Sequence, residues 1–257
     1  MKQPRNNFLR AIRKQQKQIG LWVALSNNYA AEVVADSGFD WVLIDAEHSP
    51  TSMPSLLGQL QALAAGSSTV LVRPAWNDPV LVKGLLDLGV QGLLFPMIQS
   101  VEEAERAVAA TRYPPRGIRG VAGVTRATKF GRIPDYPQTV EQETAVFVQL
   151  ETISAVENAE AIAAVEGVDG VFFGPADIAA DMGLLGQPMS KDVWGLIRPV
   201  ARLLAAKGVP VGTLVLDSNF ACELLQGEFS FVAGGSDVAL LARGADKLLA
   251  QMRAAVI

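Results

Sequence analysis

Short apolar runs alternate with longer amphipathic stretches along nearly the whole chain. The apolar runs are typical of buried strands, and the amphipathic stretches have the spacing of helices that cover a sheet. We expect strands at 21–26, 41–47, 69–74, 92–97, 145–151, 170–174, 210–215 and 229–233. We expect helices near 29–37, 53–65, 78–88, 101–111, 154–165, 190–207, 218–226 and 237–255, with a further short helix at 8–17 before the first strand.

This order gives eight strand-helix units in a chain of 257 residues. Strands that alternate with helices form a parallel sheet with right-handed crossovers, and eight such units are the size of a closed barrel. The expected fold is therefore α/β, a (β/α)8 TIM barrel with an extra N-terminal helix, in one domain over 1–257. A doubly wound open sheet is the alternative, but no Gly-x-Gly-x-x-Gly follows the first strand.

One connection, between Arg112 and Val140, is much longer than the others. A loop of this length inside a compact domain is usually functional or disordered. The chain has no internal repeat beyond the strand-helix unit and no stretch with the composition of a linker.

The overall composition argues against several classes of partner. Hydrophobic residues make up 50% of the chain and charged residues 19%, as expected for a sheet covered on both faces. A formal net charge of -4 gives no reason to expect nucleic acid or an anionic membrane as partner. No apolar run approaches the ~18 residues of a membrane span. The single cysteine, Cys222, cannot form an internal disulfide, so we expect a cytoplasmic protein.

Polar side chains follow several of the expected strands, where a parallel barrel places its reactive groups. The strand at 41–47 runs out into Asp45, Glu47 and His48, which is the only histidine of the chain. Two acids and an imidazole are not buried without partners, so this cluster requires solvent, a metal or a substrate. A solvated loop before a helix-capping serine is the alternative interpretation.

Three further strands also end in polar groups. Arg73 ends the third strand, and Gln149 and Glu151 end the fifth. Asp177 follows the sixth strand, and its carboxylate with that of Glu151 would suit Mg or Mn. Taken singly, each carboxylate could instead cap a helix, and Arg73 could form a structural ion pair. Together these residues favour a functional site over a scaffold.

Other kinds of site are excluded by what the chain lacks. One histidine cannot form a three-His zinc centre, and one cysteine cannot form a thiolate cluster. The chain has no Gly-x-Ser-x-Gly elbow and no Walker loop. Its lysines fall in expected helices, loops or the N-terminal tail, so a desolvated Schiff-base lysine is not expected.

Several motifs, spread over nearly the whole chain, are similar to those of one known family. They are Asp45-Ala-Glu-His48, Val72-Arg73-Pro74, Gly92-Leu-Leu-Phe-Pro-Met97, Tyr113-Pro-Pro-Arg-Gly-Ile-Arg-Gly120, Gln149-Leu-Glu151, Gly174-Pro-Ala-Asp177 and Gly235-Ser-Asp237. Together they resemble the HpcH/HpaI family of metal-dependent class II pyruvate aldolases. Four residues around these motifs depart from the family pattern: Phe173, Ile178, Asp181 and Gly234. Because they lie near the expected site, these departures bear on the choice of substrate.

The resemblance implies roles for the residues at the strand ends. Glu151 and Asp177 look like the protein ligands of a divalent metal, which could be Mg, Mn or Co. Arg73 would hold the keto oxygen and the enolate that develops from it. His48, oriented by Asp45, would transfer protons together with a metal-bound water.

The resemblance also implies where the substrate binds. The positions beside the metal and around the carboxylate of pyruvate are Gln149, Gly174, Pro175 and Ala176. The positions on the aldehyde side are Trp22, Val121 and Leu214, for which core packing is the alternative.

The implied reaction is the reversible cleavage of a 4-hydroxy-2-oxo acid to an aldehyde and pyruvate, or a related 2-oxo acid such as hydroxypyruvate. The catabolism of aromatic compounds and that of sugar acids would both use this reaction. The family also implies a hexamer built from dimers, with a C-terminal helix, here 239–257, exchanged between subunits. An intramolecular barrel helix would have the same apolar stripe.

Three other functions remain open from the residues alone. A barrel isomerase or epimerase of a sugar phosphate would bind phosphate at 233–237, but the seventh strand is not followed by a second glycine-rich loop. A lyase of a CoA thioester would need a basic groove, and this chain is acidic. A non-catalytic binding or scaffold protein would not need Glu151, Asp177, Arg73 and His48 together.

Overall fold

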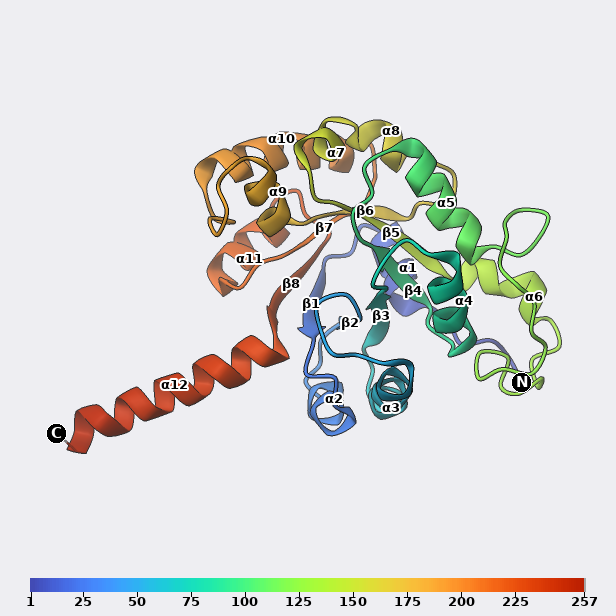
Figure 1. The fold of residues 1–257 in the computed structure, drawn as a ribbon, viewed down its shortest axis with the longest axis horizontal. Coiled ribbons are helices and arrows are strands. Elements are labelled where there is room, and N and C mark those ends of the chain that lie inside the picture. The colour runs from blue at the N-terminus through green and yellow to red at the C-terminus, as the bar shows by residue number, and fades with distance from the viewer. Residues whose placement is uncertain (257) are drawn as a thin grey trace.

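The eight expected strands close into a parallel barrel in the computed structural model, which describes residues 1–256 (Figure 1). Each strand pairs with the next one, and β1 pairs with β8 to complete the ring. The strands are β1 (Gln18–Val23), β2 (Trp41–Asp45), β3 (Thr69–Arg73), β4 (Gly92–Phe95), β5 (Ala145–Leu150), β6 (Gly170–Phe173), β7 (Val211–Leu214) and β8 (Phe231–Ser236). The expected (β/α)8 barrel is confirmed.

Helices surround the barrel and cover its outer face (Figure 1). They are α2 (Asn28–Ala35), α3 (Met53–Leu63), α4 (Pro79–Asp87), α5 (Val101–Thr111), α6 (Tyr136–Thr139), α7 (Ile153–Glu157), α8 (Ala159–Ala163), α9 (Pro175–Asp181), α10 (Lys191–Ala206) and α11 (Ser218–Gln226), with a 3-10 helix η1 (Val140–Glu143) before β5. Several of these helices are preceded by an N-cap residue whose side chain accepts an N–H of the first turn. Examples are Asn27, Asp78 and Asp217.

Some boundaries differ from the expected ones. The N-terminal helix α1 (Asn7–Arg13) ends before position 17, because Gln15 has a φ of 59° that is incompatible with a helix. β1 begins at Gln18, because its N–H donates to the carbonyl of Ser230 at 2.9 Å. The helix expected at 154–165 is two short helices that meet at Asn158.

The interior of the barrel is filled by aromatic side chains, and α1 closes its amino-terminal end. The ring of Phe8, on α1, lies 5.6 Å from those of Trp41 and Phe147 and 5.5 Å from that of Phe231. A Cβ at Gly20 would lie 2.1 Å from the indole of Trp41, so this strand position accepts only glycine without repacking. The open end of the barrel is therefore the carboxyl end of the strands.

The long connection between α5 and α6 is ordered around one buried arginine. The Arg119 guanidinium lies 4.6 Å from the ring centre of Tyr113, in the connection, and 5.8 Å from that of Tyr136, at the start of α6. Its Nη2 also lies 3.2 Å from Oδ1 of Asp87 at the end of α4. The connection is thereby attached to the barrel instead of being disordered.

The last helix, α12 (Asp237–Val256), extends away from the barrel (Figure 1). Only Asp237 is buried in it, whereas Leu241 and Leu248 are 63% and 59% exposed. The helix was expected, and its last expected residue, Ile257, lies outside the described residues. None of the helices in residues 1–256 has the length and apolar character to cross a membrane.

Candidate active site

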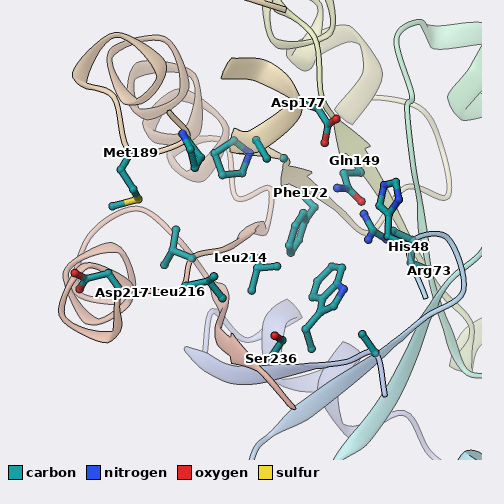
Figure 2. A pocket seen from close by; sticks show the side chains of 17 residues that line it. His48, Arg73, Gln149, Phe172, Asp177, Met189, Leu214, Leu216, Asp217 and Ser236 are labelled. Atoms are coloured by element: carbon teal, nitrogen blue, oxygen red, sulfur yellow. The ribbon is translucent and has the colours of Figure 1, made fainter. Parts of the chain in front are cut away.

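A cavity of about 680 Å³ opens at the carboxyl ends of the strands (Figure 2). The sequence-predicted residues that line it are Trp22, His48, Arg73, Gln149, Gly174, Pro175, Ala176, Asp177 and Leu214. Asp45 and Glu151 are buried beside the cavity, against Arg73 and Gln149 respectively. The closed barrel thus brings to one place side chains from five strands and the start of α9.

Arg73 is held between two carboxylates at the floor of this cavity. Its Nε donates to Oδ1 of Asp45 at 3.0 Å, and its Nη2 donates to Oδ2 at 2.5 Å. Its Nη1 lies 3.0 Å from Oε2 of Glu47. The guanidinium also lies 5.0 Å from the ring centre of Trp22, whose Nε1 donates to Oδ2 of Asp45 at 3.1 Å. Three neighbours therefore fix the guanidinium in one orientation.

Burial and charge compete at this cluster. Burial by itself would raise the pKa of Asp45, but the hydrogen bonds and charge of Arg73 outweigh it and hold that pKa below its usual value. The pKa of Glu47 is raised, because burial outweighs the attraction of Arg73. Burial would lower the pKa of Arg73, and the bonds and charge of Asp45 raise it instead. Asp45 and Arg73 therefore form an ionised pair, and Glu47 accepts a proton more readily.

The imidazole of His48 lies at the mouth of the cavity, with its side chain 68% exposed. Its Nε2 lies 3.8 Å from Oε2 of Glu47. Asp45 contacts the main chain instead: its Oδ1 accepts the N–H of Glu47 at 3.0 Å and that of His48 at 3.3 Å. Asp45 was expected to orient the imidazole, but the structure limits its contact to the backbone turn, because its side chain is taken up by Arg73.

Glu151 is a second buried carboxyl, at the end of β5. Its Oε1 accepts from Nε2 of Gln149 at 2.7 Å, and its Oε2 accepts from the main-chain N–H of Met97 at 2.8 Å. A Cβ at Gly174 would lie 2.8 Å from Oε1 of Glu151, so the absence of a side chain there makes room for the carboxyl. The buried Oε1 of Gln149 has no hydrogen-bond partner within residues 1–256. This free acceptor beside a carboxyl suits a cation or a ligand donor.

The electrostatics of Glu151 fit a divalent metal. Burial raises its pKa to about 8, and the charges of Asp177 and Glu47 add to that effect. A bound cation would offset both contributions and keep the carboxyl ionised. In the part of the chain that the structure describes, no group of three or more His, Cys, Asp or Glu side chains could hold a metal ion. Glu151 and Asp177 would thus supply two ligands and leave positions for substrate and water.

The turn from β6 into α9 offers main-chain donors to the cavity. The N–H of Gly174 donates to the carbonyl of Leu150 at 3.0 Å, and Pro175 has no N–H. The donors of the predicted carboxylate site are therefore those of Ala176 and Asp177, which as first-turn amides have no carbonyl partner within the helix. The free main-chain donors of this turn therefore lie one residue further along the chain than Pro175 and Ala176.

Of the three residues assigned to the aldehyde side, Trp22 and Leu214 line the cavity. Val121 does not: it is 73% exposed in the connection between α5 and α6, which lies on another side of the barrel (Figure 1). Within one chain, no part of that connection lines the cavity, so the structure does not bring Val121 together with the other predicted residues of the site.

Sequence reasoning missed several residues of the site. The contact of Glu47 with Arg73 was not predicted, because two acids after one strand give no sign of which of them turns inward. Phe172 could have been identified, since it lies two residues before Gly174 on the same face of β6. Met189 lies in the loop between α9 and α10, where no periodicity exists to indicate its direction.

The structure also bears on the sugar-phosphate alternative. The start of α12, where phosphate would bind, already holds the carboxylate of Asp237. Its Oδ1 accepts the N–H groups of Ala24 at 2.9 Å and of Val238 at 2.8 Å, and its Oδ2 accepts that of Leu25 at 3.1 Å. Because a carboxylate occupies these donors, they are not available to a phosphate.

Comparison with known proteins gives one consistent result. A family model described as HpcH/HpaI aldolase/citrate lyase matches residues 18–244. A pyruvate aldolase of Rhizobium etli is 52% identical over 251 residues, which cover 98% of this chain and 99% of that protein. A 4-hydroxy-2-oxo-heptane-1,7-dioate aldolase of Escherichia coli is 48% identical over 250 residues, covering 97% of this chain and 95% of that protein.

Solved structures show the same fold. An HpcH/HpaI aldolase/citrate lyase family protein from Burkholderia cenocepacia superimposes with a TM-score of 0.93 at 38% identity, covering 96% of this chain and 99% of that chain. The citrate lyase beta subunit of M. tuberculosis, in complex with oxaloacetate and magnesium, has a TM-score of 0.57 at 14% identity, covering 88% of this chain and 93% of that one. The second likeness concerns the fold alone.

Proposed function

The chain belongs to the HpcH/HpaI aldolase/citrate lyase family, and on that premise we propose how its cavity carries out aldolase chemistry. The protein is a carbon-carbon lyase that cleaves a 4-hydroxy-2-oxo acid reversibly into pyruvate and an aldehyde. We propose that the site also accepts a related 2-oxo acid, such as hydroxypyruvate, in place of pyruvate. The observation that carries it is the position of Arg73 and the first turn of α9, which face one cavity beside the buried Glu151.

We propose that Glu151 and Asp177 hold a divalent metal, which is Mg, Mn or Co. The support is the burial of Glu151, which raises its pKa to about 8, and the free acceptor on the neighbouring Gln149. When bound, the metal supplies Lewis acidity that stabilises an enolate. Gln149 keeps the Glu151 carboxyl in place through its 2.7 Å hydrogen bond.

The 2-oxo acid binds between α9 and Arg73 in this proposal. Its carboxylate accepts the N–H groups of Ala176 and Asp177, where the start of the helix favours an anion. Its keto oxygen faces the guanidinium of Arg73. When the C3–C4 bond breaks, the bonding electrons move toward that oxygen, and the fixed positive charge stabilises the enolate without rearranging.

His48 handles the proton of the substrate hydroxyl. The imidazole takes the proton from the 4-hydroxyl as the aldehyde forms, and the nearby Glu47 carboxylate stabilises the resulting imidazolium. Because the ring is exposed, it releases that proton to solvent, and a proton from solvent then adds to C3 of the enolate to give pyruvate. Asp45 is a positioning residue in this scheme. It orients Arg73 by two hydrogen bonds and fixes the turn that carries His48.

We further propose that the chain forms one aldolase domain over 1–257 and assembles as a hexamer of three dimers. The support is α12, which leaves Leu241, Leu248 and Met252 exposed along its length. An exposed apolar stripe of this kind is covered in most stable proteins. Exchange of α12 between subunits would cover it.

The proposed function is tested by exchange of the methyl protons of pyruvate in deuterated water, followed by NMR. The protein is first treated with a chelator and then supplied with Mg or Mn. We expect exchange only with metal, and its loss in Glu151→Ala and Asp177→Ala, because the enolate cannot form without the ligands. The matched control is Asp192→Ala, which removes an exposed carboxylate in the first turn of α10.

Failure of the wild-type protein to exchange pyruvate protons with any divalent metal, while it stays folded, would remove the central step of this proposal. The experiment needs no aldehyde, so its outcome does not depend on which aldehyde the enzyme prefers.

A further inference from the structure

The wall of the cavity that would face the aldehyde is apolar over most of its area. The rings of Trp22 and Phe172, 5.7 Å apart and nearly fully buried, form its inner part. Leu214, Leu216 and Met189 continue it toward the opening (Figure 2). This wall therefore offers a ligand an apolar surface and few hydrogen-bond partners.

The positive charge in the cavity lining lies at the end opposite to this apolar wall. Arg73 is the one lysine or arginine in the cavity lining within residues 1–256. Its Nε and Nη2 donate to Asp45, and its Nη1 faces Glu47 at 3.0 Å, so the guanidinium is already engaged. It is also the group assigned to the keto oxygen of the 2-oxo acid. The cavity lining of the described chain therefore offers no further lysine or arginine to a second carboxylate.

The polar groups on the aldehyde side are neutral or negative. Ser236 lies beside Trp22 and Leu214, and its Oγ accepts the N–H of Ala239 at 3.1 Å, which leaves the hydroxyl proton available. Asp217 lies at the outer rim, where its Oδ1 accepts the N–H of Phe220 at 2.9 Å. A hydroxyl group of a ligand could bond to either side chain.

We propose that this site, taken as the aldolase site described above, selects aldehydes without charge, whether apolar or hydroxylated, over aldehydes that end in a carboxylate. A carboxylate placed against Trp22 and Leu214 would lose its water without gaining a cation, and farther out it would meet the like charge of Asp217. The relatives named for a heptanedioate act on a dicarboxylate, whose cleavage releases an aldehyde that carries a carboxylate. We therefore expect the aldehyde preference of this chain to differ from that of those relatives.

The preference is measured in the direction of synthesis, with pyruvate and two aldehydes of similar length. One is 4-hydroxybutanal, which is neutral, and the other is 4-oxobutanoate, which is anionic. We expect kcat/KM for the neutral aldehyde to exceed that for the anion by about tenfold or more, because a like charge and a lost solvation shell both oppose the anion.

A designed cation should reverse part of this selection. Met189→Lys and Leu216→Lys place a positive charge on the wall at positions that are 49% and 60% exposed, so both variants should fold. Their matched controls are Met189→Gln and Leu216→Gln, which have polar side chains without the charge. We expect the ratio of anionic to neutral kcat/KM to rise by about tenfold in each lysine variant relative to its glutamine control.

The outcomes separate this inference from the proposed function. Equal or greater activity of the wild-type protein with 4-oxobutanoate overturns the inference, and so does a ratio that is the same in the lysine and glutamine variants. Exchange of pyruvate protons without turnover of any neutral aldehyde also overturns it. Absence of that exchange overturns the proposed function instead.

Discussion

Asp45 and Arg73 are register partners on β2 and β3, and their side chains meet through two hydrogen bonds of 3.0 and 2.5 Å. The pairing of the strands thus builds the ion pair directly, at the last residue of each strand. Both side chains are more than nine-tenths buried. The pair is therefore part of the barrel as well as of the site.

Removal of Asp45 should destabilise the protein strongly. Asp45→Ala leaves the buried guanidinium of Arg73 with Glu47 alone, and breaking a buried pair in this way costs roughly 3–5 kcal/mol. Urea unfolding measures the change in the free energy of unfolding. The control, Asp36→Ala, removes an exposed carboxylate at the end of α2 and should change the free energy by less than about 0.5 kcal/mol. Similar stability of the two variants would show that the pair contributes little.

Glu151 should make the stability of the metal-free protein depend on pH. Burial raises its pKa to about 8 from the ordinary value of 4.5, so between these values the folded state keeps a proton that the unfolded state has released. The resulting stability is complete below about pH 4.5 and is lost as the pH rises to about 8. Thermal melts in chelator should show Tm falling across this window.

The same melts with Glu151→Gln and with added metal identify the group. The glutamine has no charge to bury, so the fall in Tm between pH 4.5 and about 8 should be smaller than in the wild type. Mg or Mn should raise the wild-type Tm most near pH 8, where the metal replaces the proton. An unchanged slope in Glu151→Gln would assign the dependence to another residue.

Gly174→Ala should reduce activity without unfolding the barrel. The added Cβ would lie 2.8 Å from Oε1 of Glu151, so the carboxyl must move. A displacement of about 1 Å in a catalytic group costs roughly 100-fold in rate. In the control, Gly195→Ala, the new Cβ meets nothing within 4 Å, so activity should be kept. Steady-state aldol kinetics and circular dichroism compare the two, and full activity of Gly174→Ala would contradict the expectation.

Phe8→Ala should destabilise the barrel from the end opposite to the site. The ring packs against Trp41, Phe147 and Phe231, and its loss leaves a cavity that costs roughly 3–5 kcal/mol. Lys14→Ala, an exposed position just after α1, is the control. Chemical unfolding gives the free energies, and the kinetics of the folded variant should match those of the wild type. Equal stability of both variants would mean that α1 is dispensable.

A charge on the apolar stripe of α12 should disrupt the proposed hexamer. Leu248→Glu places a carboxylate at a position that is 59% exposed in one chain and would be buried by exchange of the helix. Light scattering coupled to size-exclusion chromatography should then report a smaller assembly. Lys247→Glu changes the charge of the adjacent position and should keep the wild-type mass. A wild-type protein that runs as a monomer would refute the assembly outright.

Much of the architecture could be predicted because strand and helix periodicities differ clearly. Strands β2 and β3 begin at the expected residues, since Trp41 and Thr69 follow polar turns. Gln18 was missed as the start of β1, because a polar residue that bonds to Ser230 through its backbone has no apolar signature. α9 was also missed, since a helix of seven residues is too short to show periodicity.

Site residues could be predicted from the sequence only where they lie at the carboxyl end of a strand. Arg73 and Gln149 reach the cavity because they end or nearly end their strands on its inner face. The orientation of Glu47 toward Arg73 depends on a turn whose shape the local sequence does not determine. Val121 lies in a long connection anchored by the buried Arg119, and such tertiary contacts have no local pattern.

The docking of α1 has a consequence for how the chain is made. Phe8 leaves the ribosome before all three of its partners, Trp41, Phe147 and Phe231, and the last of these lies in β8. During synthesis, α1 therefore lacks a complete set of packing partners until β8 has been made. We therefore expect the barrel to close and α1 to pack against it in the same late step of folding. A chain truncated before β8 would leave the apolar face of α1 exposed to other proteins.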